Sequence, residues 1–303
     1  MSFKTPLRYP GGKGRLGPWL AEVLRHNRIS GGTYVEPYAG GAGAALFLLL
    51  SGYVNRIVIN DADPLVYAFW KAATVETSAL AEMIRSTPVN MLTWGTQKEI
   101  IAAPERHSQL ELGFATFFLN RTNRSGIIAG GVIGGRDQRG PFKLDARYNK
   151  GDLVARIEKI GSMAAHIGVT NHDALDLLHL ADSHVEGKGL IYLDPPYFHK
   201  GSLLYRNHYK PDDHAAICDK VRELRSAVLV SYDNAQPIRT LYADIPYEEF
   251  SLRYSTHSAR PHSTEVMFYR NLALPRPPQL TRAAVLPPAR ADKATEVIPE
   301  GVH

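Results

Sequence analysis

The stretch LIYLDPPYFHKG, residues 190–201, runs from four apolar residues into a carboxylate, Asp194, followed by Pro195, Pro196 and Tyr197. Proline cannot donate a hydrogen bond to a sheet ladder, so a strand through this run must stop at Asp194. The strand then ends in a stiff tip with one acid, fixed backbone carbonyls and one aromatic face. Such a tip suits a flat ligand, although Asp-Pro-Pro-Tyr alone is equally compatible with a plain turn.

This tetrapeptide fits the activation of an exocyclic amine on a nucleobase. The lone pair of such an amine is delocalised into the ring, which makes the nitrogen a poor nucleophile. We expect the Asp194 carboxylate and the Pro195 carbonyl to accept hydrogen bonds from the two N–H groups of the amine. These hydrogen bonds favour a tetrahedral nitrogen with a localised lone pair. We also expect Tyr197 to stack on the base, which contributes about 1–3 kcal/mol. The base must first leave its duplex, at a cost of about a few kcal/mol.

A glycine-rich loop follows an earlier apolar run in YVEPYAGGAGAALFLL, residues 34–49. Glycines let a backbone turn tightly and approach a ligand closely. Counted from Gly40, the third glycine of the dinucleotide-binding pattern G-x-G-x-x-G is missing. Asp61, however, stands 21 residues after Gly40, where an acid can bind both hydroxyls of a ribose. Together these features favour a cofactor that contains adenosine over a structural turn.

A second pair of glycines lies near the N-terminus in LRYPGGKGRL, residues 7–16. Lys13 in this segment can place an ammonium group on a carboxylate or a phosphate. The segment lacks the spacing of a P-loop, G-x-x-x-x-G-K-[ST]. Taken alone, it predicts a surface turn.

Length and composition narrow the class of protein. A chain of 303 residues suits one large α/β domain, or a domain with a substantial insertion. Its single cysteine, Cys218, provides no disulfide framework and no zinc cluster, and we predict that it lies in the core. The histidines are scattered without metal-ligand spacing, so we expect no metal. The apolar runs are too short for a bilayer, which needs about 20 residues, and the N-terminus lacks an apolar h-region. We therefore expect a protein of the bacterial cytoplasm, or of a phage-infected cell.

The formal net charge of +5 is concentrated in one block of the chain. Residues 120–159 hold nine Lys and Arg against four Asp and Glu, so the remainder of the chain is neutral overall. This is the pattern expected for contact with a phosphate backbone. A solvated basic face is the alternative explanation.

Five β-rich runs alternate with helical patterns and predict a doubly wound, mostly parallel α/β fold. The runs are residues 33–37, 56–61, 166–173, 189–194 and 227–233. Acids stand at their ends, where such sheets bind ligands, although any single one could cap a helix. These acids are Glu36, Asp61, Asp173, Asp194 and Asp233. The later segments EEFSLRYS and EVMFYRN predict a closing antiparallel pair.

The alternation breaks between Asp61 and Asp173. Residues 64–119 read mostly as helix, and the glycine-rich segment 120–142 predicts a loop or hairpin. We take residues 66–165 as an inserted, mainly helical recognition domain, and residues 1–65 with 166–272 as the catalytic domain. The Pro, Ala and Arg composition of residues 273–303 predicts a disordered tail.

The order PGGK, EPYAGGAG, an acid ending the second strand, and DPPY resembles the Dam-type (α-group) DNA adenine-N6 methyltransferases. The resemblance covers nearly everything from Tyr9 to Asn271. It implies a seven-stranded S-adenosylmethionine-dependent methyltransferase sheet with an inserted DNA-recognition domain. The implied activity is site-specific transfer of a methyl group from S-adenosylmethionine to adenine N6 in double-stranded DNA, after base flipping.

The resemblance also implies roles for individual residues. The catalytic residues would be Asp194, Pro195, Pro196 and Tyr197. The cofactor-binding residues would be Tyr9, Gly12, Lys13, Glu36, Pro37, Tyr38, Gly40, Asp61, Asp173 and Asp194. Among these, Lys13 would lie near the methionine portion, Asp61 on the ribose and Asp173 near the adenine. The candidate DNA contacts are Arg121, Asn123, Arg124, Arg136 and Arg139, and we expect at least half of the arginines to bind phosphate.

Two departures from the family pattern limit the resemblance. Ala42 stands where the aromatic-x-Gly-x-Gly motif has its second glycine, with glycine delayed to Gly43. The glycine-rich segment after LNRTNRSG is particular to this chain, so a target sequence cannot be carried over from the family.

Other interpretations of the sequence stay open. Cytosine-N4 methylation uses the same amine chemistry, although that group more often has Ser in place of Asp194. RNA is the third alternative substrate, because the basic block suits it as well, although the PGGK-first motif order favours DNA. A catalytically silent DNA-binding module conflicts with the intact Asp61 and Asp194, and a nicotinamide dehydrogenase conflicts with the missing third glycine. No nuclease motif is visible, so a restriction endonuclease partner would be a separate protein.

Overall fold

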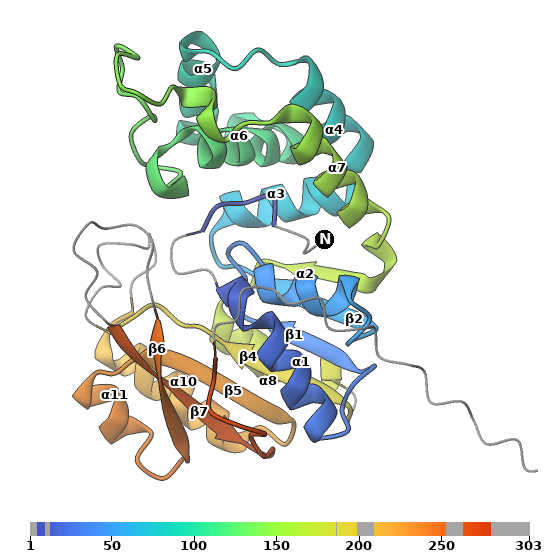
Figure 1. The fold of residues 1–303 in the computed structure, drawn as a ribbon, viewed down its shortest axis with the longest axis vertical. Helices are drawn as coiled ribbons and strands as arrows, with labels where there is room; N and C mark the ends of the chain where they lie inside the picture. Colours follow the sequence, from blue (N-terminus) through green and yellow to red (C-terminus); the bar gives the residue numbers. More distant parts are fainter. Residues whose placement is uncertain (1–4, 10–12, 186, 199–208, 253–262, 280–303) are drawn as a thin grey trace, which may run out of the picture.

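The computed structural model describes residues 5–9, 13–185, 187–198, 209–252 and 263–279. Seven strands form one sheet in the order β3-β2-β1-β4-β5-β7-β6 (Figure 1). The strands are β1 Thr33–Glu36, β2 Arg56–Asn60, β3 Ile167–Thr170, β4 Gly189–Leu193, β5 Ala227–Asp233, β6 Tyr247–Leu252 and β7 Ser263–Arg270. The pairs among β1 to β5 are parallel, and β7 runs antiparallel to β5 and β6. The structure thus confirms the mostly parallel seven-stranded sheet and its antiparallel closing pair.

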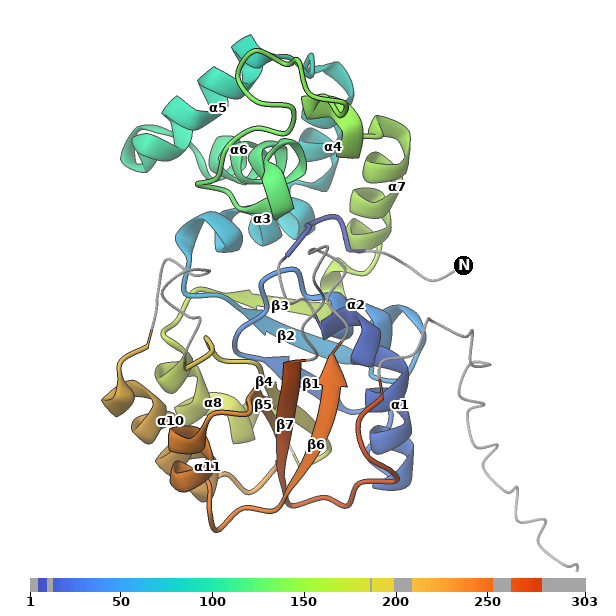
Figure 2. The same ribbon diagram turned by 60° about the vertical axis from the view of Figure 1, so that its left-hand side comes forward.

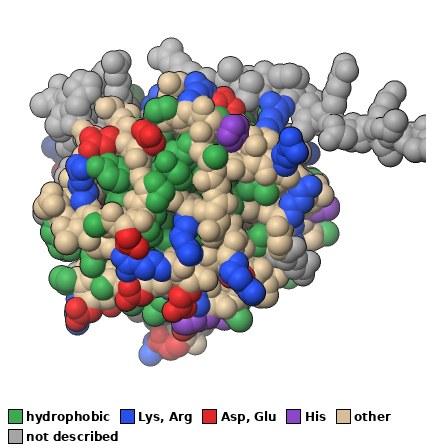
Figure 3. All heavy atoms as spheres, turned by 90° about the horizontal axis from the view of Figure 1, so that it is seen from below, with side chains coloured by type: hydrophobic (Ala, Val, Ile, Leu, Met, Phe, Trp, Pro, Cys, Tyr) green, Lys and Arg blue, Asp and Glu red, His purple; other side chains and the backbone are tan. Residues whose placement is uncertain are grey.

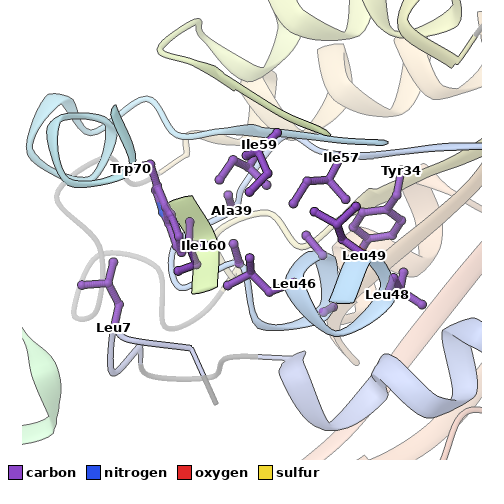
Figure 4. Close-up of a cluster of buried hydrophobic side chains, with 14 of the residues drawn as sticks. Leu7, Tyr34, Ala39, Leu46, Leu48, Leu49, Ile57, Ile59, Trp70 and Ile160 are labelled. Carbon is purple, nitrogen blue, oxygen red and sulfur yellow. The ribbon is translucent and has the colours of Figure 1, made fainter. Parts of the chain in front are cut away.

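Helices cover both faces of the sheet, which explains why its strands are apolar throughout. Tyr34 and Ile57 belong to one core cluster, whereas the next residues along the same strands, Val35 and Val58, belong to the other. Figure 4 shows part of the first cluster, in which Leu46 of helix α2 lies near these strands. Burying one such aliphatic side chain stabilises the fold by roughly 1.5–3 kcal/mol. The covering helices are α1 (Gly17–His26) and α2 (Gly43–Leu50) on one face, and α8 (Ala174–Val185), α10 (Pro211–Glu223) and α11 (Gln236–Leu241) on the other.

A helical insertion lies above the sheet between β2 and β3 (Figures 1 and 2). Its first helix, α3, begins after Asp63, whose side chain accepts a hydrogen bond from the Leu65 N–H at 2.9 Å. Gly113 allows α6 to approach α3 closely, because a Cβ atom there would lie 2.7 Å from the Ala68 carbonyl oxygen. The helices are α3 Pro64–Val75, α4 Thr77–Ser86, α5 Met91–Ala102, α6 Gln109–Thr122 and α7 Lys150–Gly161. The short 3-10 helices among the described residues are η1 Lys13–Leu16, η2 Pro104–Arg106, η3 Arg124–Gly126, η4 Leu144–Arg147 and η5 Ala164–His166. The boundaries 66–165 for a recognition domain stay a prediction.

Residues 273–279 correct the predicted start of the disordered tail. The Trp19 indole donates a hydrogen bond to the Arg276 carbonyl at 3.1 Å, and the Arg276 guanidinium binds Glu22 at 2.7 Å. The Asn27 side chain also pairs with the Ala273 backbone. These contacts hold the segment against α1. The rest of the predicted tail, residues 280–303, lies outside the described residues.

Two smaller expectations concern the core and the membrane. Cys218 is 0 % exposed in the second core cluster, which confirms its predicted place in the core. Within the described ranges, the helices are all too short or too polar to cross a membrane.

Candidate active site

The acids at the strand ends gather where the strand order reverses. β1 and β4 are neighbours in the sheet although they are far apart in the chain, and open α/β sheets bind ligands at such a point. Glu36 is the last residue of β1, Asp61 follows β2, and Asp194 follows β4. The strand ends therefore place three of the five predicted acids, Glu36, Asp61 and Asp194, at the ends of neighbouring strands.

Asp194 is held by two donors from distant parts of the chain. The Lys13 ammonium lies 2.8 Å from Asp194 Oδ1 and 3.1 Å from Oδ2, and the Ser231 hydroxyl donates to Oδ1 at 2.7 Å. The Asp194 side chain is 17 % exposed. Oδ1 thus receives two short hydrogen bonds, whereas Oδ2 keeps acceptor capacity for a further N–H group.

Lys13 links Asp194 to a second carboxylate on β7. Its ammonium lies 2.9 Å from the Tyr197 hydroxyl and 3.5 Å from Glu265 Oε2, and the Tyr197 hydroxyl donates to Glu265. We call Lys13, Asp194, Tyr197 and Glu265 the ion-pair cluster. Burial alone would lower the pKa of the Lys13 ammonium, but the charges of Asp194, Tyr197 and Glu265 outweigh it and raise that pKa well above its ordinary value. Lys13 therefore stays charged.

The predicted catalytic tetrapeptide, residues 194–197, is largely enclosed. Pro195 and Pro196 are buried, and Tyr197 is 8 % exposed with its ring centroid 5.1 Å from the Lys13 ammonium. The Phe198 N–H donates to Asp233 Oδ1 at 3.0 Å, which fixes the chain after the tetrapeptide. The tyrosine hydroxyl is thus anchored inward. Stacking of Tyr197 on a base stays a prediction.

The glycine-rich loop is shaped by Asp61 and Tyr9. Asp61 accepts the backbone N–H groups of Gly40 and Asp63, each at 2.9 Å. Gly40 has a φ of 45°, and a Cβ atom there would lie 2.7 Å from the Tyr9 ring, so only glycine fits. Ala42 also adopts the left-handed conformation, with a φ of 45°. An alanine in that conformation costs about 1 kcal/mol, and this loop therefore keeps its shape despite the departure from the family's glycine.

Two residues of the loop region have shifted pKa values. Burial raises the pKa of the Asp61 carboxyl to about 7, against the opposing hydrogen bonds from Asp63 and Gly40. Burial and then the charge of Asp194 raise the pKa of Glu36 well above its ordinary value. Glu36 Oε2 is buried and has no hydrogen-bond partner among the described residues. Both acids thus lie at the loop with capacity for a polar ligand.

The other residues predicted to bind the cofactor have different surroundings. Pro37 offers its carbonyl to the Asn60 side chain at 3.0 Å, and the Tyr38 hydroxyl pairs with that of Tyr209 at 2.8 Å. Asp173 caps α8 by accepting the Leu175 N–H at 2.9 Å. Gly12 lies outside the described residues. None of these contacts tests a role in cofactor binding.

The glycine-rich segment forms the predicted hairpin, closed by an antiparallel bridge between Asn123 and Val132. Arg124, Arg136 and Arg139 are exposed on it. The structure corrects the assignment of Asn123 as a DNA contact. Asn123 is 0 % exposed, and its side-chain amide is used within the chain by Trp94 and by two backbone carbonyls.

Arg121 also differs from the exposed arginines. Its guanidinium donates to the Arg147 carbonyl at 2.8 Å and to the Pro6 carbonyl at 3.4 Å. Burial, together with the nearby charge of Arg8, lowers its pKa to about 10. This side chain therefore holds neighbouring backbone segments together.

Sequence reasoning missed Ser231 and Glu265. Each is 0 % exposed inside a strand that is otherwise mainly apolar, AVLVSYD and STEVMFYR. A polar residue within such a run was the available signal, because buried polar groups require partners. The partner itself depends on the order β4-β5-β7, which no local pattern reveals.

Comparison with known proteins identifies the family. The family described as D12 class N6 adenine-specific DNA methyltransferase matches residues 9–257. The chain belongs to this family. It is therefore a DNA methyltransferase specific for adenine N6, as the motifs predict, and the cytosine-N4, silent-module and dehydrogenase alternatives are set aside. Membership implies S-adenosylmethionine as the methyl donor and DNA as the substrate.

Individual relatives are distant. The type II methyltransferase M.MjaIII of Methanocaldococcus jannaschii is 22 % identical over 213 residues, covering 65 % of this chain and 70 % of its own. The rRNA methyltransferase AviRa from Streptomyces viridochromogenes is 14 % identical, with 86 % of each chain covered and a TM-score of 0.41. A SAM-dependent methyltransferase from Agrobacterium tumefaciens is 10 % identical, with 84 % of this chain and 60 % of its own covered and a TM-score of 0.39.

Proposed function

We propose that this methyltransferase acts on adenine within a short specific sequence of double-stranded DNA, and that the target base leaves the duplex to reach Asp194. The acceptor capacity of Asp194 Oδ2 at the end of β4 supports this most directly. In a duplex the adenine N6 group is paired and stacked, so it can meet a carboxylate in an enclosed site only after flipping.

The reaction requires orientation of the amine more than removal of its proton. When bound, S-adenosylmethionine supplies an electrophilic methyl group on a sulfonium. Asp194 and the Pro195 carbonyl accept hydrogen bonds from the two N–H groups of the adenine amine. This arrangement directs the nitrogen lone pair at the methyl carbon. This pair forms the new N–C bond, the electrons of the S–C bond stay on sulfur, and the nitrogen then loses one proton to water. Asp194 stabilises the positive charge that develops on the nitrogen.

The charges of the ion-pair cluster fit this methyl donor. The cluster contains one ammonium, from Lys13, and two carboxylates, from Asp194 and Glu265. S-adenosylmethionine contains one carboxylate, one ammonium and one sulfonium, which leaves it with a single positive charge. Opposite net charges in a poorly solvated site attract each other. Beside the cluster, Glu36 offers a buried oxygen without a partner among the described residues.

Binding of S-adenosylmethionine should depend on pH through Asp61. We propose that the Asp61 carboxylate accepts the ribose hydroxyls, which requires its ionised form. Burial raises the pKa of Asp61 to about 7, so protonation competes with binding as the pH falls through that value. The dissociation constant should rise about tenfold between pH 8 and pH 6, measured by calorimetry.

Asp61→Asn should bind the donor more weakly and show little dependence on pH in that range. Asp219→Asn, which changes a carboxylate that is 72 % exposed on α10, serves as the control and should behave as the unaltered protein does. A flat profile for the unaltered protein, or unchanged affinity in Asp61→Asn, would contradict the ribose contact.

We further propose that Arg124, Arg136 and Arg139 bind the DNA backbone. They are exposed on the glycine-rich segment 120–142, within the basic block of residues 120–159. The face at the opposite end of the molecule shows Lys and Arg interspersed with Asp and Glu (Figure 3). A duplex is therefore attracted to the insertion more than to that face.

Replacing both Arg136 and Arg139 by alanine should weaken DNA binding for all sequences alike. Each lost phosphate contact lowers the slope of log affinity against log salt by about 0.9, so the double variant should lose about two units of slope. Fluorescence anisotropy across a salt series measures this. Arg225→Ala, at a side chain 91 % exposed on the other domain, is the control. A slope equal to that of the unaltered protein would remove these two residues from the interface.

A partner and a location are further parts of the proposal. One relative is named a type II methyltransferase, and we extend that role to this chain, with a separate restriction endonuclease as the partner. The proposed location is the cytoplasm, where cellular DNA and S-adenosylmethionine are both present. We also propose that the reaction needs no metal.

The proposed substrate can be tested with purified protein and S-adenosylmethionine. Duplex DNA, heat-separated strands of the same DNA and total RNA are treated in parallel, and their nucleosides are analysed by mass spectrometry. We expect N6-methyldeoxyadenosine predominantly in the duplex sample. Equal methylation of the separated strands would contradict recognition of a duplex, and methylation of RNA alone would overturn the proposal.

A further inference from the structure

Glu265 is a buried carboxylate that no sequence motif of the active site includes. It lies on β7, the strand that runs antiparallel to its neighbours, and is 0 % exposed. A carboxylate in such a place is costly unless it is paired and hydrogen-bonded. Its partners include the Lys13 ammonium at 3.5 Å and the Tyr197 hydroxyl.

These contacts make Lys13 a cation shared between two carboxylates. Asp194 Oδ1 lies 2.8 Å from the ammonium, and Glu265 Oε2 lies 3.5 Å from it on another strand. With Lys13 and Asp194 alone, the charges would cancel beside the acceptor oxygen. Glu265 adds one negative charge, so that the cluster as a whole is negative.

We propose that Glu265 is a positioning residue for methyl transfer, which acts through Lys13 and Tyr197 and supplies a negative charge beside the Lys13–Asp194 pair. This inference rests on the proposed function of Asp194. The reaction moves a positive charge from sulfur toward the target nitrogen at Asp194. Fixed negative charge beside Asp194 therefore stabilises the bound cation, and stabilises the transition state more, because the positive charge then lies nearer to the ion-pair cluster. If Glu265 had only a structural role, it would pair with Lys13 and Tyr197, but its charge would not make the site bind a cationic ligand more tightly than a neutral one.

The test compares two ligands that differ chiefly in charge. S-adenosylmethionine has a sulfonium, whereas S-adenosylhomocysteine has a neutral thioether. Glu265→Gln keeps the shape and an acceptor for the Tyr197 hydroxyl but removes the charge. By calorimetry, we expect the dissociation constant of S-adenosylmethionine to rise about tenfold in this variant, and that of S-adenosylhomocysteine to change within about twofold. A similar change for both ligands, or no change for either, would overturn the proposal.

Two further variants separate charge from packing. Tyr197→Phe removes the hydroxyl contact but leaves the charges of the cluster, so the ratio of the two dissociation constants should stay at its original value. Glu265→Asp retains the charge on a shorter side chain and should also retain that ratio, which keeps the proposal testable if Glu265→Gln does not fold. If the preference for S-adenosylmethionine over S-adenosylhomocysteine falls as far in Glu265→Asp as in Glu265→Gln, the proposal is contradicted.

Kinetics provide a second readout. In Glu265→Gln the kcat for methyl transfer should fall at least about tenfold with little change in the KM for DNA. Because the ligand ratio is measured without DNA, its outcome is independent of the target base. An unchanged ratio of the two dissociation constants in Glu265→Gln would therefore overturn the role of Glu265 alone. Absence of adenine methylation by the unaltered protein would instead overturn the proposed function.

Discussion

Replacing Asp194 by alanine should abolish methyl transfer, whereas the dissociation constant of S-adenosylmethionine should rise only about tenfold, because the ion-pair cluster loses one negative charge. In the proposed mechanism, Asp194 Oδ2 accepts a hydrogen bond that orients the target amine, and the charge of Asp194 stabilises the transition state. Loss of a single stabilising group of this kind lowers kcat about 100- to 1000-fold, and here orientation of the amine is lost as well. Lys13 keeps Glu265 as a counter-charge in this variant, so the cluster does not leave an isolated buried cation.

The measurement pairs turnover with calorimetry on the same preparations. Asp194→Asn retains a carbonyl acceptor without the charge and should show an intermediate rate. Near-native turnover in Asp194→Ala would contradict the assignment of Asp194. Loss of S-adenosylmethionine binding equal to the loss of turnover would assign it to the cofactor instead of the amine.

Replacing Lys13 by methionine should lower the free energy of unfolding by about 3–5 kcal/mol. The Lys13 side chain is 3 % exposed and its partner Glu265 is 0 % exposed, so removing the ammonium takes away a counter-charge that lies 3.5 Å from a buried carboxylate. Asp194, which is 17 % exposed, contributes less to this penalty. Urea denaturation followed by circular dichroism gives the change in free energy.

Adding Glu265→Gln to Lys13→Met should restore part of the lost stability, because the uncompensated charge is then removed. Lys220→Met is the matched control. Lys220 pairs with Glu223, which is 67 % exposed, and such surface pairs contribute about 0–1 kcal/mol. An equal loss in the Lys13 and Lys220 variants, or strict additivity of the double variant, would show that the cluster has no special role in stability.

The architecture is largely readable from the sequence because it depends on local patterns. Apolar runs that end in acids predict parallel strands, and β1 and β4 end at Glu36 and Leu193, each one residue before the end of the predicted runs 33–37 and 189–194. The closing pair, the helical insertion and the hairpin are predicted in the same way from alternation, helical periodicity and glycine content. Asp194 itself is found because Pro-Pro terminates a strand on a carboxylate.

The features that the sequence does not reveal depend on contacts between distant segments. Lys13 is recognisable as a cation for a carboxylate, but only the sheet order shows that this carboxylate is Asp194 and that Glu265 shares it. Asn123 looks like a DNA contact in a polar segment, yet it is buried at the bridge that closes the hairpin, with its amide already hydrogen-bonded. The segment after Ala273 reads as a tail, because the side chains that hold it, such as Trp19, lie on α1.

The central claim is adenine N6 methylation directed by Asp194, and long-read sequencing that detects modified bases tests it most directly. The plasmid DNA comes from a methylation-deficient host that expresses either this protein or its Asp194→Ala variant. We predict N6-methyladenine at one recurring short motif, absent with the variant. N4-methylcytosine, or the same methylation pattern with Asp194→Ala, would contradict the account.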